Sequence, residues 1–485
     1  MQHSTPALLT ALALSGCGVA DVVFSSAGDP EGMGLVGEEH SGVQVEMSTT
    51  DARSLVGATT GDQVGGGFLT TLGDTDVALL LVGIPAFDHG NGLATAHRQP
   101  NSGLPTRINE GLSQLQGERW SGLGCATTAF RSALGHELLA VAACTGAGEH
   151  APGAVHVLDA SVLSNPGVHD TSATTRMDGR TPDGRFGASL AAGDLDGDGV
   201  DDLLIGAPQA DDGAGQLYLL AADDALDLRA AEDASSLTDR TDGQDGLGTL
   251  VYIGGDLTGD GHNDAVVCAP GTAVGPSAHA GKCNVLAGGL PLLRAGGNLA
   301  ASVFSTIRGS DPGDALGDGP QSVTMGDFDG NGQADLAIGA PGRDLQTVDG
   351  GVVGIWFDGD LEGRRSIRDA DILLGGQGAS GHAISAVPDA DGDGLDELLV
   401  GSPTSGAASE GAVSFVTGLA PGLMLLPQEA RQTWMGSGTG DALGTTLTTA
   451  PLLGADGLGR VAAGAPGDDR AGEDAGAVWI FSLYD

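Results

Sequence analysis

Apolar residues along this chain recur in short runs separated by stretches rich in glycine and aspartate. An alternating apolar run lies at 188–195, and the runs at 203–205 and 216–220 are almost continuously apolar. A weaker run lies at 371–374. Short apolar runs bounded by turn residues are typical of β-strands, and these runs are shorter than the roughly ten residues that a helix usually needs. The pattern therefore predicts many short strands joined by polar turns.

The same succession of strands and turns repeats seven times. Each repeat has an apolar run after a Phe-Gly or Leu-Gly pair, then an acidic loop, then a second strand that ends at Gly-Ala-Pro or a variant of it. These triplets start at residues 83, 143, 206, 268, 339, 401 and 464. A repeat of about 60 residues cannot bury its apolar face alone, whereas repeats packed around a closed ring can. The sequence therefore predicts an all-β, seven-bladed propeller over residues 51–485, with four antiparallel strands per blade.

The landmarks on either side of an aspartate-rich loop resemble the FG-GAP repeats of the integrin α-subunit β-propeller. Phe186-Gly187 and Gly206-Ala207-Pro208 show both landmarks, and the resemblance covers residues 52–485. It implies that a strand from the N-terminal side completes the last blade, and we expect 52–57 to form it. The third strand of the seventh repeat is followed directly by Asp485, so the last blade needs such a strand on other grounds as well.

The amino-acid composition excludes several classes of protein and of binding partner. The 485 residues include 85 Gly and 21 Pro, which disfavours a helical protein, while 40% hydrophobic residues disfavour a disordered chain. With 64 acidic and 20 basic residues the formal net charge is −44, so nucleic acid is not expected as a partner. Divalent cations would complement this charge, although a general compositional bias toward Asp, Gly and Ala is the alternative explanation.

The N-terminus has the features of an export signal. An apolar run at 7–14 is too short to span a bilayer and is followed by Leu14-Ser15-Gly16-Cys17, which resembles the lipobox of bacterial lipoproteins. We therefore expect a signal peptide at 1–17 with lipidated Cys17, and a linker or extended segment at 18–50. The protein would be exported and held in the cell envelope, at the outer membrane, cell surface or periplasmic face, by this lipid anchor only. A plain secretory signal with an incidental cysteine is the alternative.

Four further cysteines are an even number, as expected for two disulfides in an exported protein. The repeat places one pair on neighbouring strands of the second unit and the other pair on the second and third strands of the fourth. We therefore expect the disulfides Cys125–Cys144 and Cys268–Cys283, with four buried free thiols as the alternative.

The third to sixth repeats carry acidic side chains at alternate positions of the loop after the first strand. Such a loop, with a glycine that permits a tight turn and a final carboxylate at the next strand, surrounds a small space with oxygen atoms. Hard oxygen donors in this number suit Ca²⁺, so we expect about three to four Ca²⁺ sites. The predicted ligands are Asp194, Asp196, Asp198, Val200 and Asp202; Asp256, Thr258, Asp260, His262 and Asp264; Asp327, Asp329, Asn331, Gln333 and Asp335; and Asp389, Asp391, Asp393, Leu395 and Glu397.

These loops differ from EF-hands, which need a glutamate at the twelfth position leading into a helix. The corresponding residues here are the strand residues Ile205, Val267, Ile338 and Val400. Metal-free hairpins stabilised by Asx turns are the alternative for all four loops. In the loop at 256–264, Thr258 replaces a carboxylate by a hydroxyl, so this loop should bind its cation more weakly.

The other three repeats are expected to lack metal. In the seventh, Arg460 takes the place of the final carboxylate, beside Leu452, Gly454 and Asp456. The first two have shortened or acid-poor loops, at 73–76 and 131–137.

No catalytic motif stands out: the sequence has no Gly-x-Ser-x-Gly, no His-Glu-x-x-His and no phosphate-binding loop, and its 11 histidines are scattered. We therefore expect a non-enzymatic protein that binds a protein or glycan ligand through its loop-rich face. A structural envelope component, or a hydrolase or lyase acting on polysaccharide or lipid, is the alternative.

Overall fold

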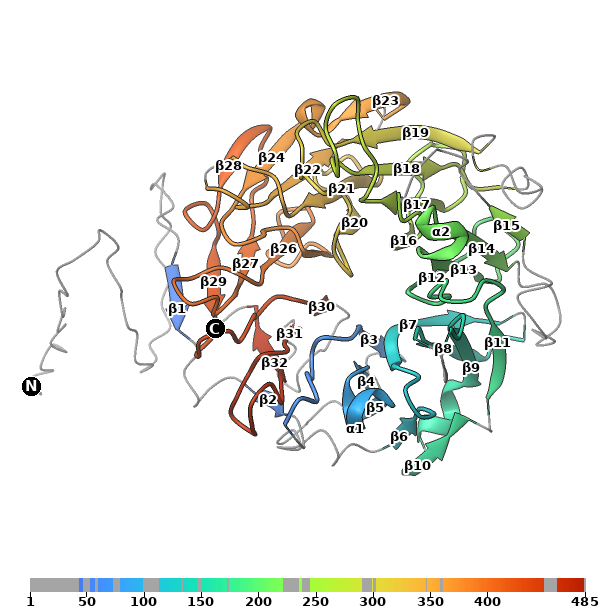
Figure 1. Cartoon of the computed structure of the whole chain (residues 1–485). Helices are drawn as coiled ribbons and strands as arrows, with labels where there is room; N and C mark the ends of the chain where they lie inside the picture. The colour runs from blue at the N-terminus through green and yellow to red at the C-terminus, as the bar shows by residue number, and fades with distance from the viewer. Residues whose placement is uncertain are drawn as a thin grey trace, which may run out of the picture.

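Seven separate sheets are arranged as blades around a common centre (Figure 1). The structure is a computed structural model that describes residues 43–46, 53–56, 60–72, 79–98, 113–132, 134–145, 150–164, 166–171, 174–220, 235–237, 245–289, 299, 302–345, 347–357, 361–448 and 460–483. The predicted all-β, seven-bladed propeller is confirmed.

Within a blade the strands follow one another outward from the centre and pair antiparallel. Blades 1 and 2 consist of β3 (Leu69–Leu72), β4 (Leu79–Ile84), β5 (Leu93–Arg98) and β6 (Ser113–Gln116), then β7 (Leu123–Arg131), β8 (Glu137–Ala143), β9 (Ala154–Asp159) and β11 (Thr175–Asp178). Blades 3 and 4 consist of β12 (Ser189–Gly193), β13 (Asp202–Ala207), β14 (Gln216–Leu220) and β15 (Ser235–Leu237), then β16 (Leu250–Gly254), β17 (Asp264–Ala269), β18 (Lys282–Leu286) and β19 (Val303–Arg308). Blades 5 and 6 consist of β20 (Val323–Gly326), β21 (Asp335–Ala340), β22 (Val352–Trp356) and β24 (Ile372–Gly375), then β25 (Ala383–Val387), β26 (Glu397–Ser402), β27 (Ala412–Val416) and β29 (Gln432–Met435).

Blade 7 combines the two ends of the described chain. It consists of β30 (Leu447–Thr448), β31 (Arg460–Ala465) and β32 (Ala477–Ser482), completed by β2 (Arg53–Val56). The strand β2 runs antiparallel to β32, with Arg53 opposite Ile480 and Val56 opposite Ala477. The predicted closure of the ring by an N-terminal strand is confirmed.

Four blades carry a fifth, outermost strand that the repeat pattern did not predict. These strands are β10 (Gly167–Asp170), β23 (Gly363–Ser366), β28 (Gly422–Leu425) and β1 (Val43–Glu46), and they pair parallel with β6, β19, β24 and β29. Three of them come from the link between the third and fourth strands of the following blade, and β1 precedes β2 in the same way. Each fifth strand therefore ties a blade to its neighbour by main-chain hydrogen bonds. Short helical segments complete the connections: α1 (Phe87–Gly90), α2 (Ala210–Gly213), η2 (Ala160–Ser164) and η5 (Ile367–Asp369).

The hydrophobic core is divided among the blade junctions. Each of the clusters found in the described residues combines side chains of two adjacent blades, and together the clusters cover all seven junctions. Between blades 2 and 3, Phe186 lies edge-on to Tyr218 with ring centroids 5.0 Å apart, and both side chains are about 1% exposed. Both rings belong to blade 3, and Phe186 also packs in the cluster shared with blade 2 and donates its N–H to the Pro152 carbonyl at 2.8 Å, so this landmark phenylalanine holds blade 3 against blade 2.

The landmark glycines explain why blades pack so closely. Gly381 of blade 6 has φ +88° and donates its N–H to the carbonyl of Gly401, 3.1 Å away, at the Gly-Ala-Pro landmark of the same blade. A Cβ atom on Gly339, the corresponding glycine of blade 5, would collide with the Gly381 carbonyl. The two landmarks therefore meet across the junction, where a side chain would push the blades apart.

Candidate functional site

Four acidic loops lie at one end of the ring, each joining the first and second strands of its blade. They connect β12 to β13, β16 to β17, β20 to β21 and β25 to β26 in blades 3 to 6. Because successive strands run antiparallel, the links between second and third strands, which include α1 and α2, lie at the opposite end. We call the two ends the acidic-loop face and the α2 face.

Carboxylates shape each acidic loop from within. In blade 3, Asp194 accepts the N–H groups of Gly197, Asp198 and Gly199 at 2.7–3.1 Å. Asp202, at the start of β13, accepts the N–H of Leu195 at 3.0 Å. The N–H groups of the loop therefore point toward the carboxylates of the first and last acids, and these bonds hold the loop in a tight turn. The same bonds recur in blade 4, around Asp256 and Asp264, and in blade 5, around Asp327 and Asp335.

Carboxylate oxygens converge within 4.8 Å of one another in all four loops. The converging groups are Asp194, Asp196 and Asp202; Asp256, Asp260 and Asp264; Asp327, Asp329 and Asp335; and Asp389, Asp391, Asp393 and Glu397. Such oxygen-only clusters could hold a divalent cation, since hard cations prefer carboxylate and carbonyl ligands.

The remaining predicted ligands lie in the same loops in other roles. Asp198 stands outside the converging group and accepts the N–H of Val200 at 2.8 Å. The same turn-closing bond joins Asn331 to Gln333, and it also joins Asp260 to His262 and Asp393 to Leu395, although these two aspartates belong to the converging groups as well. The Thr258 hydroxyl lies 3.4 Å from a carboxylate oxygen of Asp256 and therefore borders the blade 4 cluster.

Crowding and burial make these clusters electrostatically costly without a cation. The pKa of Glu397 is raised to about 7, chiefly by burial and also by the charges of Asp391 and Asp393, against the opposing effect of the N–H groups of Ala390 and Asp391. Burial also raises the pKa of Asp264 to about 6, with a smaller contribution from the charge of Asp260. A bound cation would relieve this repulsion and favour the ionised forms of both groups.

The similarity to known proteins includes the repeats that carry the acidic loops. The FG-GAP repeat family model matches residues 186–220, 319–356 and 380–416, which lie in blades 3, 5 and 6 and include three of the four acidic loops. The integrin alpha pat-2 of Caenorhabditis elegans is 28% identical over 244 residues, 46% of this chain and 18% of that protein. The integrin alpha-PS2 of Drosophila melanogaster is 36% identical over 93 residues, 18% of this chain and 7% of that protein. The chain is an integrin α-like FG-GAP propeller.

Similarity of this FG-GAP propeller extends beyond integrins. A phosphatidylinositol-glycan-specific phospholipase D of Rattus norvegicus is 32% identical over 161 residues, 32% of this chain and 18% of that protein. This chain thus spans less than a fifth of the length of each of these relatives. Among the residues described, the FG-GAP propeller has no helix that is both long and apolar enough to span a bilayer.

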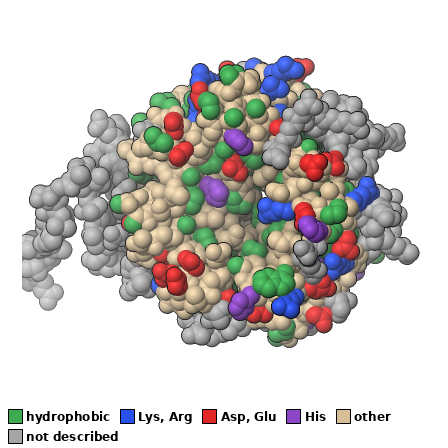
Figure 2. Space-filling view, in the orientation of Figure 1, with side chains coloured by type: hydrophobic (Ala, Val, Ile, Leu, Met, Phe, Trp, Pro, Cys, Tyr) green, Lys and Arg blue, Asp and Glu red, His purple; other side chains and the backbone are tan. Residues whose placement is uncertain are grey.

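The α2 face carries a polar cleft that sequence reasoning did not identify. It has a volume of about 580 Å³ and lies between the links that precede β12, follow β13 and precede β16. Its lining includes Thr181, Asp183, Arg185, Gln209, Asp212 and Thr249. Figure 2 shows this end of the ring, hollowed toward its centre, with acidic, basic and histidine side chains near the hollow. No repeat of residue types marks the cleft, because its lining comes from links that differ between blades.

The cleft carries one basic side chain in its lining, that of Arg185. Arg185 is exposed, with its backbone in the left-handed region at φ +55°. On the same rim Asp183 is bonded to His150 at 2.6 Å. The cleft therefore offers a guanidinium group and several carboxylate, amide and hydroxyl groups to a polar ligand.

Both predicted disulfides are present in the propeller. Cys125 is bonded to Cys144 within blade 2, and Cys268 to Cys283 in blade 4, where the two residues lie directly opposite each other on β17 and β18. Cys17 lies outside the described residues, as do positions 73–76 of blade 1 and 452–456 of blade 7. Arg460 begins β31, and in blade 2 the hairpin closes with Arg131 opposite Glu137.

Two further aspartates of the acidic loops were not predicted from the sequence. Asp201 and Asp396 directly precede the final carboxylates Asp202 and Glu397, and both bond to the preceding blade. Their acidic side chains were the only signal in the sequence, and they lie out of step with the alternate positions that mark the ligands.

Proposed function

We propose that this FG-GAP propeller is a calcium-stabilised, exported protein of the cell envelope that binds a protein or glycan ligand through its α2 face. The cleft beside Arg185 is the observation that carries the ligand-binding part, because it gathers polar groups from three separate links at one end of a rigid ring. The similarity to integrin α subunits and the shared FG-GAP repeats support a role in recognition.

Calcium binding is supported by the four convergent carboxylate groups. Asp, Glu, Asn, Thr and main-chain oxygens make up the predicted donor sets, and an all-oxygen set suits Ca²⁺. The ions would lie on the face opposite the cleft, so their role is to fix the loops and the strands that the loops join. Metal analysis of the purified chain should find about three to four Ca²⁺ ions, and a count near zero would refute calcium binding.

The ligand is best sought with variants matched in chemistry. Arg185→Ala removes a guanidinium group from the cleft, and Arg364→Ala removes an exposed one from the outer strand β23. Binding would be measured on a glycan array and by cross-linking to envelope proteins, with calcium and with chelator. We expect Arg185→Ala to abolish a signal that Arg364→Ala retains; equal retention by both variants would exclude the cleft.

Envelope attachment rests on the Leu-Ser-Gly-Cys sequence that ends at Cys17. Lipidation there would anchor the protein at the outer membrane, the cell surface or the periplasmic face. Cys17→Ala should move the protein from the membrane to the soluble fraction; unchanged fractionation would show that no lipid at Cys17 holds it.

A hydrolase is the second candidate. It is favoured by the similarity to a phospholipase D and by a cluster of one aspartate and two histidines on the α2 face. Asp318 lies at the start of blade 5 and His382 at the start of blade 6, and the two influence each other electrostatically together with His279. Burial raises the pKa of Asp318 and lowers that of His382, although each histidine moderates the effect on Asp318. Hydrolysis of phospholipid or polysaccharide that Asp318→Asn abolishes would favour this candidate over a pure binding protein.

A further inference from the structure

The acidic loops of blades 5 and 6 are joined through one side chain, Asp396. Its N–H donates to the carbonyl of Asp327 at 2.8 Å, and its Oδ2 accepts the N–H of Asp327 at 2.9 Å. Both main-chain polar groups of Asp327, the first carboxylate residue of the blade 5 loop, are therefore bonded to a residue of blade 6.

The other carboxylate oxygen of Asp396 holds its own loop. Oδ1 accepts the N–H of Asp389, the first carboxylate residue of blade 6, at 3.1 Å. Asp389 has φ 25°, in the left-handed region, and among the described residues it accepts a single loop N–H, from Gly394. Asp327 accepts three. Asp389 thus holds its own loop through fewer bonds than Asp327 does, and Asp396 of the same loop supplies a further bond.

Apolar contact reinforces the junction. A Cβ atom on Gly330 would lie 2.7 Å from Cδ2 of Leu395, so the tip of the blade 5 loop rests directly against the residue before Asp396. Glu397, the last carboxylate of the blade 6 cluster, follows Asp396 in the chain. Any ordering of Glu397 is therefore transmitted through one peptide unit to the residue that holds Asp327.

We propose that Asp396 couples the two loops, so that a cation bound in blade 6 raises the cation affinity of blade 5, and the reverse by the same factor. This inference rests on the proposed calcium binding. A cation in blade 6 draws Asp389 and Glu397 together and fixes Asp396 between them; the main chain of Asp327 is then already ordered when blade 5 binds its own ion. Sharing the entropic cost of ordering in this way makes binding at two sites cooperative. Asp396 is a positioning residue, since it lies outside the converging ligand group.

The chain supplies a matched control in blade 3. Asp201 makes the same reciprocal pair with Arg131 of β7: its N–H donates to the Arg131 carbonyl at 3.1 Å, and its Oδ2 accepts the Arg131 N–H. Blade 2 contributes no converging carboxylate group among the described residues, so this pair joins a candidate metal loop to a loop without one. The equivalent positions in blades 4 and 5 are Asn263 and Ala334.

Hydrogen–deuterium exchange of the full chain over a calcium titration would test the coupling loop by loop. Amides of Gly330 and Gly332 report on blade 5, because they bond to Asp327, and the amide of Gly394 reports on blade 6. Disabling blade 6 with Asp393→Ala should weaken the calcium-dependent protection of blade 5 by about fivefold in the wild-type background, near the lower end for linked sites. In the Asp396→Asn background the same Asp393→Ala change should have an effect within about twofold, because the single amide oxygen cannot accept the N–H groups of both Asp327 and Asp389, and the side-chain link between the loops is lost.

The variants are chosen so that each outcome decides a different question. Asp396→Asn keeps the side-chain shape with one acceptor oxygen, and the effect of its lost charge is common to the two chains compared in that background, so it cancels in their ratio. Asp201→Asn removes the corresponding charge from blade 3 and should leave the coupling between blades 5 and 6 intact. An Asp393→Ala effect of equal size with and without Asp396→Asn, or no effect in the wild type, would overturn the coupling. A wild-type chain with no calcium-dependent protection in any loop would instead refute the proposed calcium binding itself.

Discussion

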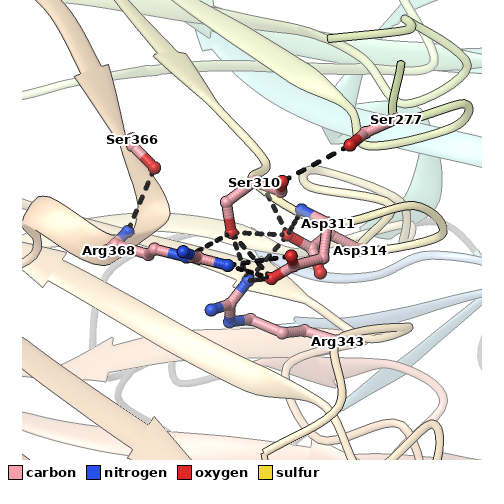
Figure 3. Close-up of polar contacts among 7 residues, drawn as sticks. All are labelled: Ser277, Ser310, Asp311, Asp314, Arg343, Ser366 and Arg368. Carbon is pink, nitrogen blue, oxygen red and sulfur yellow. Dashed lines mark hydrogen bonds and ion pairs between the residues drawn. The ribbon is translucent and has the colours of Figure 1, made fainter. Parts of the chain in front are cut away.

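Arg343 and Asp314 form a buried ion pair across the junction between blades 4 and 5, with Nη1 of Arg343 2.7 Å from Oδ2 of Asp314. Their side chains are 8% and 2% exposed. Figure 3 shows both in one network with Ser310, Asp311 and the more exposed Arg368. The same Oδ2 of Asp314 accepts the N–H groups of Ser310 and Asp311, so a single carboxylate fixes the link between the blades and the guanidinium that reaches it.

Removing Arg343 should destabilise the ring far more than removing Arg368. Arg343→Met leaves the buried Asp314 carboxylate without its counter-charge, a change that costs about 3–5 kcal/mol in buried pairs. Arg368 bonds the same Asp311 and Ser310 but its side chain is 59% exposed, so water screens the pair and Arg368→Ala should have a much smaller effect. Denaturant midpoints of the two variants in calcium would test this ranking, and equal midpoints would contradict it.

Substituting one landmark glycine and one glycine of the outer strand β23 should separate two reasons why a position needs glycine, close packing and a left-handed backbone. Gly339→Ala places a Cβ against the Gly381 carbonyl of the next blade, and overpacking of this kind costs about 1–3 kcal/mol or more. Gly363 has φ +93°, and a Cβ added there would meet no atom within 4 Å, so Gly363→Ala introduces backbone strain alone, about 1–2 kcal/mol. Thermal melting would compare them. If Gly339→Ala melts at the wild-type temperature, the close approach of the blades does not limit packing.

The seven-bladed architecture could be predicted from the sequence because every blade repeats the same order of strands, turns and landmark motifs. Each Phe-Gly and Gly-Ala-Pro pair marks a main-chain contact without room for a side chain, as at Gly339 and Gly381, so the landmarks survive where other positions vary between blades. The role of β2 followed from simple counting of strands per blade. The fifth strands could not be foreseen, because β23 and β28 pair through main-chain groups and need no particular side chains.

The candidate site was predictable only as far as local spacing determines it. Alternate acids within one loop must face the same space, so most of the carboxylates converge as expected, while Asp198 turns to close the loop at Val200. The bonds of Asp396 to Asp327 and the lining of the cleft at Arg185 involve different blades. Contacts of that kind depend on how blades meet, which spacing within a repeat does not reveal.

Acid should destabilise the propeller partly through its buried histidines. Burial lowers the pKa of His97 from 6.5 to about 4, and also lowers that of His156 to about 4, with the charge of Arg176 adding to the effect. Between pH 6.5 and 4 the unfolded chain binds protons at these imidazoles that the folded chain does not. The free energy of unfolding should therefore fall as the pH decreases through this window, by up to about 3 kcal/mol per histidine.

A substitution isolates this contribution from that of the carboxylates. His97→Asn should flatten the pH dependence of unfolding between pH 6.5 and 4, measured by denaturant titration in saturating calcium and compared as the difference from wild type. His89, whose side chain is 89% exposed, is the matched control, and His89→Asn should leave the slope unchanged. An identical slope for wild type and His97→Asn would show that His97 takes up its proton without unfolding the chain.

Calcium should distinguish two neighbouring aspartates of blade 3. The carboxylate of Asp196 belongs to the converging group, whereas that of Asp198 closes the turn at Val200. Asp196→Ala should therefore remove most of the thermal stabilisation that calcium gives this loop, and Asp198→Ala should remove less. In chelator the order should reverse, because Asp196 then contributes repulsion between like charges and only a long bond from the Asp198 N–H at 3.2 Å, while Asp198 accepts the Val200 N–H at 2.8 Å. The measurement is the melting temperature of each variant with calcium and with chelator. If Asp198→Ala loses more of the calcium-dependent stabilisation than Asp196→Ala, the ion is bound by Asp198 and not by the converging group that contains Asp196.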